Sequence, residues 1–305
     1  MGYDVSALSN YVKENEAILI KDVVLGSDFK GSTIDKMNHQ VGVKSKERMH
    51  PTNIDPTLQD ATSCGFSAQG STVISEREIE TAPMKVNDQF CKKDLLGKFA
   101  EYEVRFGANS EALPFEAEIA DGYVKGTQKK LEKLVWQGNK TGNSDLIDGL
   151  LTIAGGADSA STITASTANG ASAYEAIKKA ALLIPEAILD DAVIFVSPAL
   201  YKEYVMELVE KNLYHFAPDA KIEDLDITVP GTDIAVHRTY GMTGVNNKIY
   251  ATSYKNIIYG CDMLGDAEEF KSWYSLDDDV NRIKIEFNAG VNTLFPDCVV
   301  VVTKN

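Results

Sequence analysis

Apolar and small residues recur at alternating steps of three and four between residues 114 and 138, in PFEAEIADGYVKGTQKKLEKLVWQG. This spacing places them on one face of a helix. The stripe consists of Ala117, Ala120, Val124, Thr127, Leu131 and Leu134. Acids lie in the first half and lysines in the second, which complements the helix dipole, and Asp121 and Lys125 are spaced to pair. The pattern predicts a helix about 36 Å long, with Gly138 at its C-cap.

Two glycines, Gly122 and Gly126, lie four residues apart inside this predicted helix. Each weakens the helix by about 1 kcal/mol relative to alanine. Together they leave a smooth strip where another backbone can lie close. Two interpretations stay open: a long core helix with two tolerated glycines, or a spine that crosses a flat, extended subunit.

The middle of the chain alternates helix and strand patterns. The nearly all-apolar run at 192–197 predicts a buried strand. One helix pattern precedes it and begins at a capping box formed by Ser172 and Glu175. A second helix pattern follows it, with Ser197 as the N-cap and Pro198 at the first helical position. This order predicts α/β packing in this part of the chain.

Strand patterns dominate from residue 222 onward. Two short runs flank a tight turn at Pro230 and Gly231, which predicts a hairpin over 225–238. Alternating apolar and charged residues around 280–287 predict a half-buried strand. The apolar run at 298–304 predicts a buried strand near the end of the sequence.

The first 90 residues show little of the pattern that builds a core. Residues 1–55 are weakly periodic, which indicates either a poorly ordered tail or an arm that wraps a neighbouring subunit. Residues 60–90 have strand signals with few apolar positions, and the residues around Arg77 divide by alternation into two faces. The faces are Glu76, Glu78 and Glu80 on one side and Ser75, Arg77 and Ile79 on the other. Burial cannot offset the ordering entropy of so polar a strand. We therefore expect a projecting hairpin, followed by a short amphipathic helix over 91–104.

Composition narrows the class of protein. The 305 residues are 44% hydrophobic and 25% charged, as in soluble globular proteins, and the net charge is −15. No apolar run is long enough for a membrane helix, and no secretory signal is visible. An acidic chain is repelled by nucleic acid at long range, which excludes a sequence-reading DNA binder but not a wall that encloses DNA. The four cysteines form no CxxC pair and are expected to be free thiols: Cys64, Cys91, Cys261 and Cys298.

Motifs that carry chemistry are missing from the sequence. It holds no glycine-rich nucleotide loop, no HExxH and no GxSxG, and its four histidines lie in separate segments. The acidic run Asp277–Asp279 lacks the spacing of a calcium loop and predicts a solvated turn, although a metal there stays open. We therefore expect no enzyme and no catalytic, cofactor-binding or metal-binding residues. A soluble cytoplasmic hydrolase remains an alternative, with acids such as Asp226 or Glu268 in a cleft.

The order of these features resembles a known family. A long arm, a polar hairpin and a spine helix ending in WQGN are followed by DGLL at 148–151, and then by a strand that ends in SP and starts a helix. The segments 131–151 and 184–204 match best. This order is similar to that of the major capsid proteins of tailed bacteriophages, which have the Hong Kong 97-like fold.

The resemblance implies an α+β fold class with a Hong Kong 97-like division of the chain. The implied regions are an N-terminal arm (1–55), an extended hairpin loop (56–90), a peripheral domain containing the spine helix (91–152), an axial domain (153–254) and a return to the strands of the peripheral domain (255–305).

The resemblance also implies a function and partners. The chain would self-assemble through hexamers and pentamers into the icosahedral shell of a virion, built in the host bacterial cytoplasm. The shell would enclose double-stranded DNA without sequence-specific binding and without a membrane. Portal, scaffolding and decoration proteins are implied partners. An encapsulin-type nanocompartment shell protein and a tail or baseplate protein remain rival interpretations.

Overall fold

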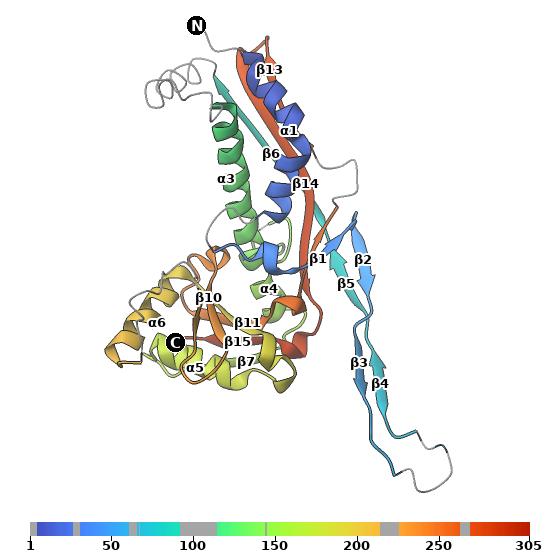
Figure 1. Cartoon of the computed structure of the whole chain (residues 1–305), viewed down its shortest axis with the longest axis vertical. Helices are drawn as coiled ribbons and strands as arrows, with labels where there is room; N and C mark the ends of the chain where they lie inside the picture. Colours follow the sequence, from blue (N-terminus) through green and yellow to red (C-terminus); the bar gives the residue numbers. More distant parts are fainter. Residues whose placement is uncertain are drawn as a thin grey trace.

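The computed structural model describes residues 5–26, 31–60, 66, 68–91, 115–143, 145–213, 226–262 and 269–305. The subunit is elongated, and two sheets with their helices form its body while a thin hairpin projects away from it (Figure 1). Several features discussed above lie outside the described residues: most of the helix expected over 91–104, together with Cys64 and Glu268.

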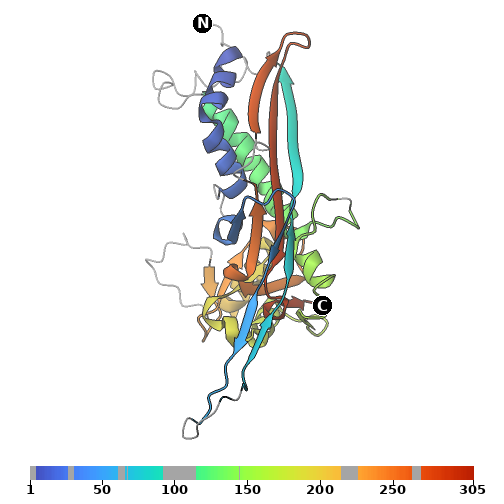
Figure 2. The ribbon, with the colours of Figure 1, turned by 90° about the vertical axis from the view of Figure 1, so that its right-hand side faces the viewer.

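Two long helices cover one face of a five-stranded sheet (Figure 2). They are α1 (Val5–Leu25) and α3 (Phe115–Gln137), and α3 confirms the helix predicted over 114–138. The strands are β1 (Asn38–Val41), β12 (Ile257–Cys261), β14 (Val280–Thr293), β13 (Glu269–Ser275) and β6 (Ala82–Cys91). β14 pairs with β13, β12 and β6, so it is the central strand of this sheet.

The helix α1 corrects the expectation that residues 1–55 form an arm. Its inward side chains are almost fully buried against α3 and β13, and they are Leu8, Val12, Leu19, Val23 and Val24. These positions are spaced four or seven residues apart over most of the helix, so they form one narrow face. The arm interpretation is therefore wrong for residues 5–25, because this segment builds the core of its own chain.

A six-stranded sheet forms the second unit of the body. Its strands are, in spatial order, β7 (Ile163–Ser166), β15 (Val300–Thr303), β11 (Lys248–Ser253), β8 (Ala192–Val196), β10 (Ala235–Arg238) and β9 (Asp226–Thr228). The helices α5 (Ala173–Leu183) and α6 (Pro198–Glu210) pack on this sheet, and α4 (Leu150–Gly155) leads into the unit. The predicted helix starts are confirmed, since the hydroxyls of Ser172 and Ser197 accept bonds from Glu175 N and Leu200 N.

The position of β15 corrects another expectation. Residues 255–305 were expected to return to the first sheet, and β12, β13 and β14 do so. β15 instead lies between β7 and β11 inside the six-stranded sheet. An apolar strand carries no local signal for which of two sheets it will join, so pattern alone does not assign it.

The hairpin also begins earlier than expected. Its part next to the body pairs β2 (Lys46–Met49) with β5 (Arg77–Glu80), and its outer part pairs β3 (Thr52–Asp55) with β4 (Ser71–Ile74). The outgoing limb thus lies within 46–55, which the expected division assigned to the arm. The boundary of 56–90 is wrong at both ends, because β6 belongs to the five-stranded sheet.

Short 3-10 turns complete the described elements: η1 (Ile34–Lys36), η3 (Glu186–Asp191), η4 (Tyr240–Met242), η5 (Tyr254–Asn256) and η6 (Pro296–Cys298). The main core lies between the two long helices and the first sheet, and a second core lies beneath α5 and α6. Within the described part of the chain, no helix is both long and apolar enough to cross a membrane.

Candidate assembly surface: the projecting hairpin and its anchor

The part of the hairpin next to the body has one inward and one outward face, as the alternation predicted. Ile79 is fully buried on the inward face, in a small cluster with Val43 and Ile258. The outward face carries exposed ion pairs: Lys46 with Glu78 and Glu80, and Arg48 with Glu76. Exposed pairs of this kind contribute little free energy. The inward contacts therefore hold this part of the hairpin against the body.

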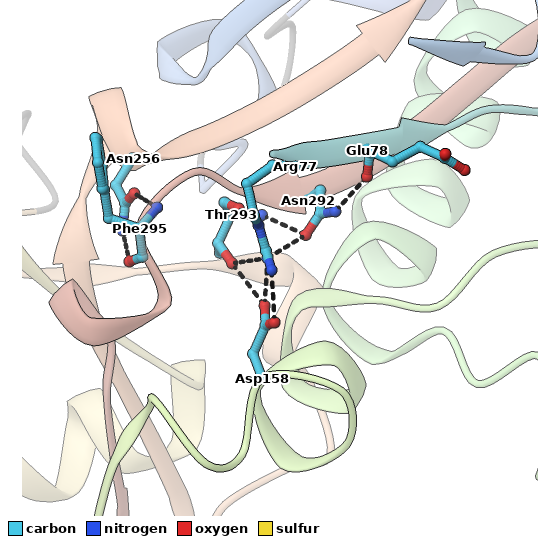
Figure 3. Close-up of polar contacts among 7 residues, drawn as sticks. All are labelled: Arg77, Glu78, Asp158, Asn256, Asn292, Thr293 and Phe295. Carbon is cyan, nitrogen blue, oxygen red and sulfur yellow. Dashed lines mark hydrogen bonds and ion pairs between the residues drawn. The ribbon is translucent and has the colours of Figure 1, made fainter. Parts of the chain in front are cut away.

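Arg77 is the main polar anchor of the hairpin (Figure 3). Its two Nη atoms donate to the two carboxylate oxygens of Asp158, at 2.8 and 2.6 Å. Its Nε atom donates to the carbonyl of Thr293 at 3.1 Å, and Nη2 also lies 3.2 Å from Oδ1 of Asn292. Asp158 is 6% exposed. A paired, two-pronged contact with a buried carboxylate is both strong and directional.

This anchor joins three parts of the chain. Arg77 lies on β5, Asp158 lies in the turn after α4, and Asn292 and Thr293 end β14. The amide of Asn292 also donates to the backbone carbonyl of Glu78 at 2.7 Å (Figure 3). The direction in which the hairpin leaves the body is therefore set by contacts with the end of β14 and with the turn after α4.

A cavity of about 300 Å³ lies beside the anchor. Its lining mixes charged side chains with apolar ones such as Ile153 and Val291. At its edge, Lys140 donates to Glu80 at 3.2 Å. This bond to the Lys140 ammonium lowers the pKa of the Glu80 carboxyl.

The outer part of the hairpin has an uncovered apolar face. Ile54 and Ile74 are 64% and 66% exposed. The register places them on one face together with two threonines, because Thr52 opposes Ile74 and Ile54 opposes Thr72. Val73 lies on the opposite face, across from Asn53. Two strands alone are marginally stable in water, so a face of this kind gains stability from another surface.

A buried carboxylate joins the spine helix to the second sheet unit. Glu132 is 0% exposed, and its oxygens accept bonds from the backbone N–H of Thr33, the hydroxyls of Thr33 and Thr239, and the indole N–H of Trp136. The shortest of these contacts is 2.5 Å, from the Thr33 hydroxyl. Among the described residues, no cation pairs with this carboxylate. Burial raises the pKa of Glu132.

Within the described part of the chain, the residues expected to carry chemistry do not assemble into a site. Among the residues that the structure describes, no three His, Cys, Asp or Glu side chains gather as metal ligands would. Asp277–Asp279 lie in the turn between β13 and β14, where Asp278 pairs with Arg282 and Asp279 accepts a bond from Tyr274. The side chain of Asp226, like Glu268, lies outside the described part of the chain. Cys91, Cys261 and Cys298 are free thiols, as predicted.

Comparisons with solved structures identify the fold of this chain. No protein-family model and no curated protein matches the sequence. A chain of the satellite phage P4 procapsid including the size determination (Sid) protein aligns with a TM-score of 0.63 at 13% identity, and the alignment covers 100% of this chain and 92% of that one. The chain has the fold of phage capsid proteins.

Two further structures share this capsid fold. The capsid of an empty GTA particle aligns with a TM-score of 0.58 at 9% identity, covering 91% of each chain. A chain of Gordonia phage Cozz aligns with a TM-score of 0.56 at 11% identity, covering 90% of this chain and 87% of that one. The similarity to capsid structures therefore extends over 90% or more of this chain.

Proposed function

We propose that this chain is a major capsid protein of a tailed bacteriophage, which assembles with copies of itself into an icosahedral shell. The observation that carries the proposal is the projecting hairpin on a subunit with the phage capsid fold. Its Ile54 and Ile74 face is uncovered in the single chain. Closed symmetric assembly buries such a face on every copy, and several weak contacts per subunit then act together.

The proposal assigns Hong Kong 97-like regions to the observed parts. The peripheral domain comprises α1, α3 and the five-stranded sheet. The axial domain comprises the six-stranded sheet with α5 and α6. The extended loop is the hairpin from β2 to β5, and the Arg77–Asp158 contact supports a defined angle between this loop and the body.

The proposed role is structural and not enzymatic. The subunits form hexamers and pentamers around double-stranded DNA in the virion, after assembly in the host cytoplasm. Portal, scaffolding and decoration proteins are the further partners proposed for such a shell. No membrane takes part in the proposed assembly.

Electron microscopy of assembled material, with nucleic acid assayed in the same fraction, tests the proposal. Closed icosahedral particles built of hexamers and pentamers, filled with DNA or empty, are the expected result. Particles filled with foreign protein would instead identify a nanocompartment shell of the encapsulin type, and tubes or rings would identify a tail component. A compact monomer that persists when neighbouring genes are co-expressed would overturn the shell function.

A further inference from the structure

The exposed positions of α3 between residues 122 and 133 are all glycine or lysine, whereas Tyr123 in the same stretch is half-buried. The exposed positions form one set, here called the lysine strip: Gly122, Lys125, Gly126, Lys129, Lys130 and Lys133. The strip carries four positive charges in a chain whose net charge is −15. It belongs to α3, one of the two helices that cover the five-stranded sheet (Figure 2).

The lysines of the strip are unpaired, unlike many others in the described part of the chain. Six lysines elsewhere have a carboxylate within ion-pair distance: Lys46, Lys140, Lys255, Lys271, Lys284 and Lys304. Among the described residues, none of the four strip lysines has such a partner. The ion pair expected between Asp121 and Lys125 is likewise not formed. The positive charge of the strip is therefore available to a partner.

The residues of the lysine strip destabilise the helix α3. Like charges four apart, as in Lys125, Lys129 and Lys133, destabilise a helix by about 0.2–0.5 kcal/mol per pair. Each glycine costs about 1 kcal/mol relative to alanine. A Cβ atom at Gly122 or Gly126 would meet nothing within 4 Å, so packing within the chain does not require either glycine. A contact with another molecule would explain why α3 carries both the like-charged lysines and the two glycines.

The geometry suits a long, thin anion. Lys125, Lys129 and Lys133 lie on successive turns, about 6 Å apart along the helix axis. Gly122 and Gly126 have no side chains, so a charged polymer can approach the helix backbone between the lysines. Each ammonium group is a flexible point charge, which binds phosphate without reading a sequence.

The lysine strip lacks the residue types that bind another protein or a single-stranded nucleic acid. Interfaces between proteins are depleted of lysine and centre on aromatic, apolar or arginine anchors. Binding of single strands relies on aromatic side chains that stack on bases. None of these residue types occurs at the exposed positions of the strip. The backbone of a duplex needs only positive charge.

We infer that the lysine strip of α3 is a sequence-independent contact surface for the phosphate backbone of duplex DNA. This inference rests on the proposed capsid function for its setting, and it turns the face formed by α1 and α3 toward the interior of the shell. One strip binds weakly because the rest of the chain is acidic. Many strips in one shell bind the same duplex at once and add their contacts.

The test measures how binding of a mixed-sequence 30-base-pair duplex to the full chain depends on salt. Four phosphate contacts predict a slope of about −3.6 in log affinity against log salt, which is about a 150-fold loss of affinity between 50 and 200 mM. A variant with Lys125, Lys129, Lys130 and Lys133 changed to glutamine should lose most of this slope and at least tenfold in affinity at 50 mM salt. Glutamine has a similar helix propensity, so α3 is retained.

A matched variant changes four exposed lysines elsewhere to glutamine: Lys44, Lys85, Lys178 and Lys202. This variant removes the same charge, and its affinity for the duplex should stay within twofold of that of the unaltered chain. A second test variant, Gly122→Glu with Gly126→Glu, places acids on the strip without removing a lysine and should also lose at least tenfold in affinity at 50 mM salt. Equal losses in the matched variant, or an unchanged slope in both strip variants, would overturn the inference. So would equal competition by polyglutamate, which would indicate an acidic protein partner.

Microscopy of the same preparations separates this inference from the proposed function. Shells that form from the strip variants but hold DNA less tightly support both. Shells that form with unchanged DNA binding overturn the inference and leave the capsid function intact. Failure of the unaltered chain to form shells counts against the function, whereas the duplex measurement on the free subunit still decides the inference.

Discussion

The hydroxyl of Thr239 donates a 3.0 Å hydrogen bond to the carboxylate of Glu132, across the boundary between the second sheet unit and the spine helix. The same hydroxyl accepts a bond from Gly241 N, so its hydrogen is directed at Glu132. The hydroxyl of Thr33 is directed in the same way, because it accepts from the indole of Trp136. These bonds favour an ionised carboxylate, whereas burial opposes it. The carboxylate therefore holds together three segments that are far apart in the sequence.

Replacing Glu132 with alanine should strongly destabilise the subunit. The change leaves several buried donors without an acceptor, each at a cost of about 1–3 kcal/mol. We expect the free energy of unfolding, measured by urea titration, to fall by about 3 kcal/mol or more. Glu118→Ala, an exposed change on the same helix, is the control and should stay within about 0.5 kcal/mol. Equal effects of the two changes would show that the buried network contributes nothing.

The stability of the subunit should also depend on pH through Glu132. Burial raises the pKa of Glu132 in the folded chain above the ordinary 4.5. Between pH 4.5 and this raised pKa, the folded chain keeps a proton that the unfolded chain has released. The free energy of unfolding then falls as the pH rises through this window. Urea titrations over this pH window compare the unaltered chain with Glu132→Gln, whose amide does not titrate. The free energy of unfolding of the unaltered chain should fall relative to that of the variant as the pH rises. A rise relative to the variant would contradict the prediction.

Replacing Arg77 with lysine should loosen the base of the hairpin. Lysine keeps the charge but cannot make the two-pronged contact with Asp158 or the bond to Thr293 O. We expect hydrogen exchange at the β5 amides to become faster, because the free energy of local opening should fall by about 2 kcal/mol. Arg48→Lys alters an exposed pair with Glu76 on the same hairpin and should have almost no effect. Unchanged exchange in the Arg77 variant would refute the anchor.

The double change Ile54→Ser with Ile74→Ser should abolish shell assembly while leaving the free subunit as stable as before. Both side chains are mostly exposed in the single chain, so their loss costs that chain little. In a shell, each buried isoleucine contributes about 1.5–3 kcal/mol per copy. Light scattering during assembly and thermal unfolding of the subunit measure the two effects. Val73→Ser, on the opposite face, should assemble normally, and if it fails equally then the wrong face has been assigned.

Replacing Gly241 with alanine should destabilise the contact between the two sheet units. A Cβ atom there would overlap the indole of Trp136 and lie 2.7 Å from the backbone oxygen of Glu132. Overpacking of this kind costs about 1–3 kcal/mol, and thermal unfolding should report it as a lower melting temperature. The control is Gly155→Ala, where the new atom meets nothing within 4 Å and should cause no loss. A melting temperature that Gly241→Ala leaves unchanged would show that the two units can separate slightly without cost.

Features set by short-range physics were predictable from the sequence. The periodicity of α3, the N-cap of α6 at Ser197 and the division of faces around Arg77 depend only on neighbours within one element. Features set by distant partners were not predictable. The helix α1 carries a narrow apolar stripe that becomes informative only once β13 and α3 lie against it.

The two polar networks show the same limit. Arg77 and Asp158 are 81 positions apart, and Thr33 and Thr239 lie 99 and 107 positions from Glu132. One local signal did exist, because Glu132 lies four positions before Trp136 and so shares one side of α3 with a large apolar side chain. That signal indicates a buried network without naming its partners.

The location of β15 ties the folding of the subunit to its synthesis. β15 is the last strand in sequence, yet it fills the gap between β7 and β11. While a ribosome is still making residues 300–303, β7 has no partner and the second core stays open. A chain that lacks residues 300–303 therefore leaves β7 and β11 without the strand that joins them, and the second core stays uncovered. If the chain forms the proposed shell, we expect incomplete chains of this kind to be excluded from it.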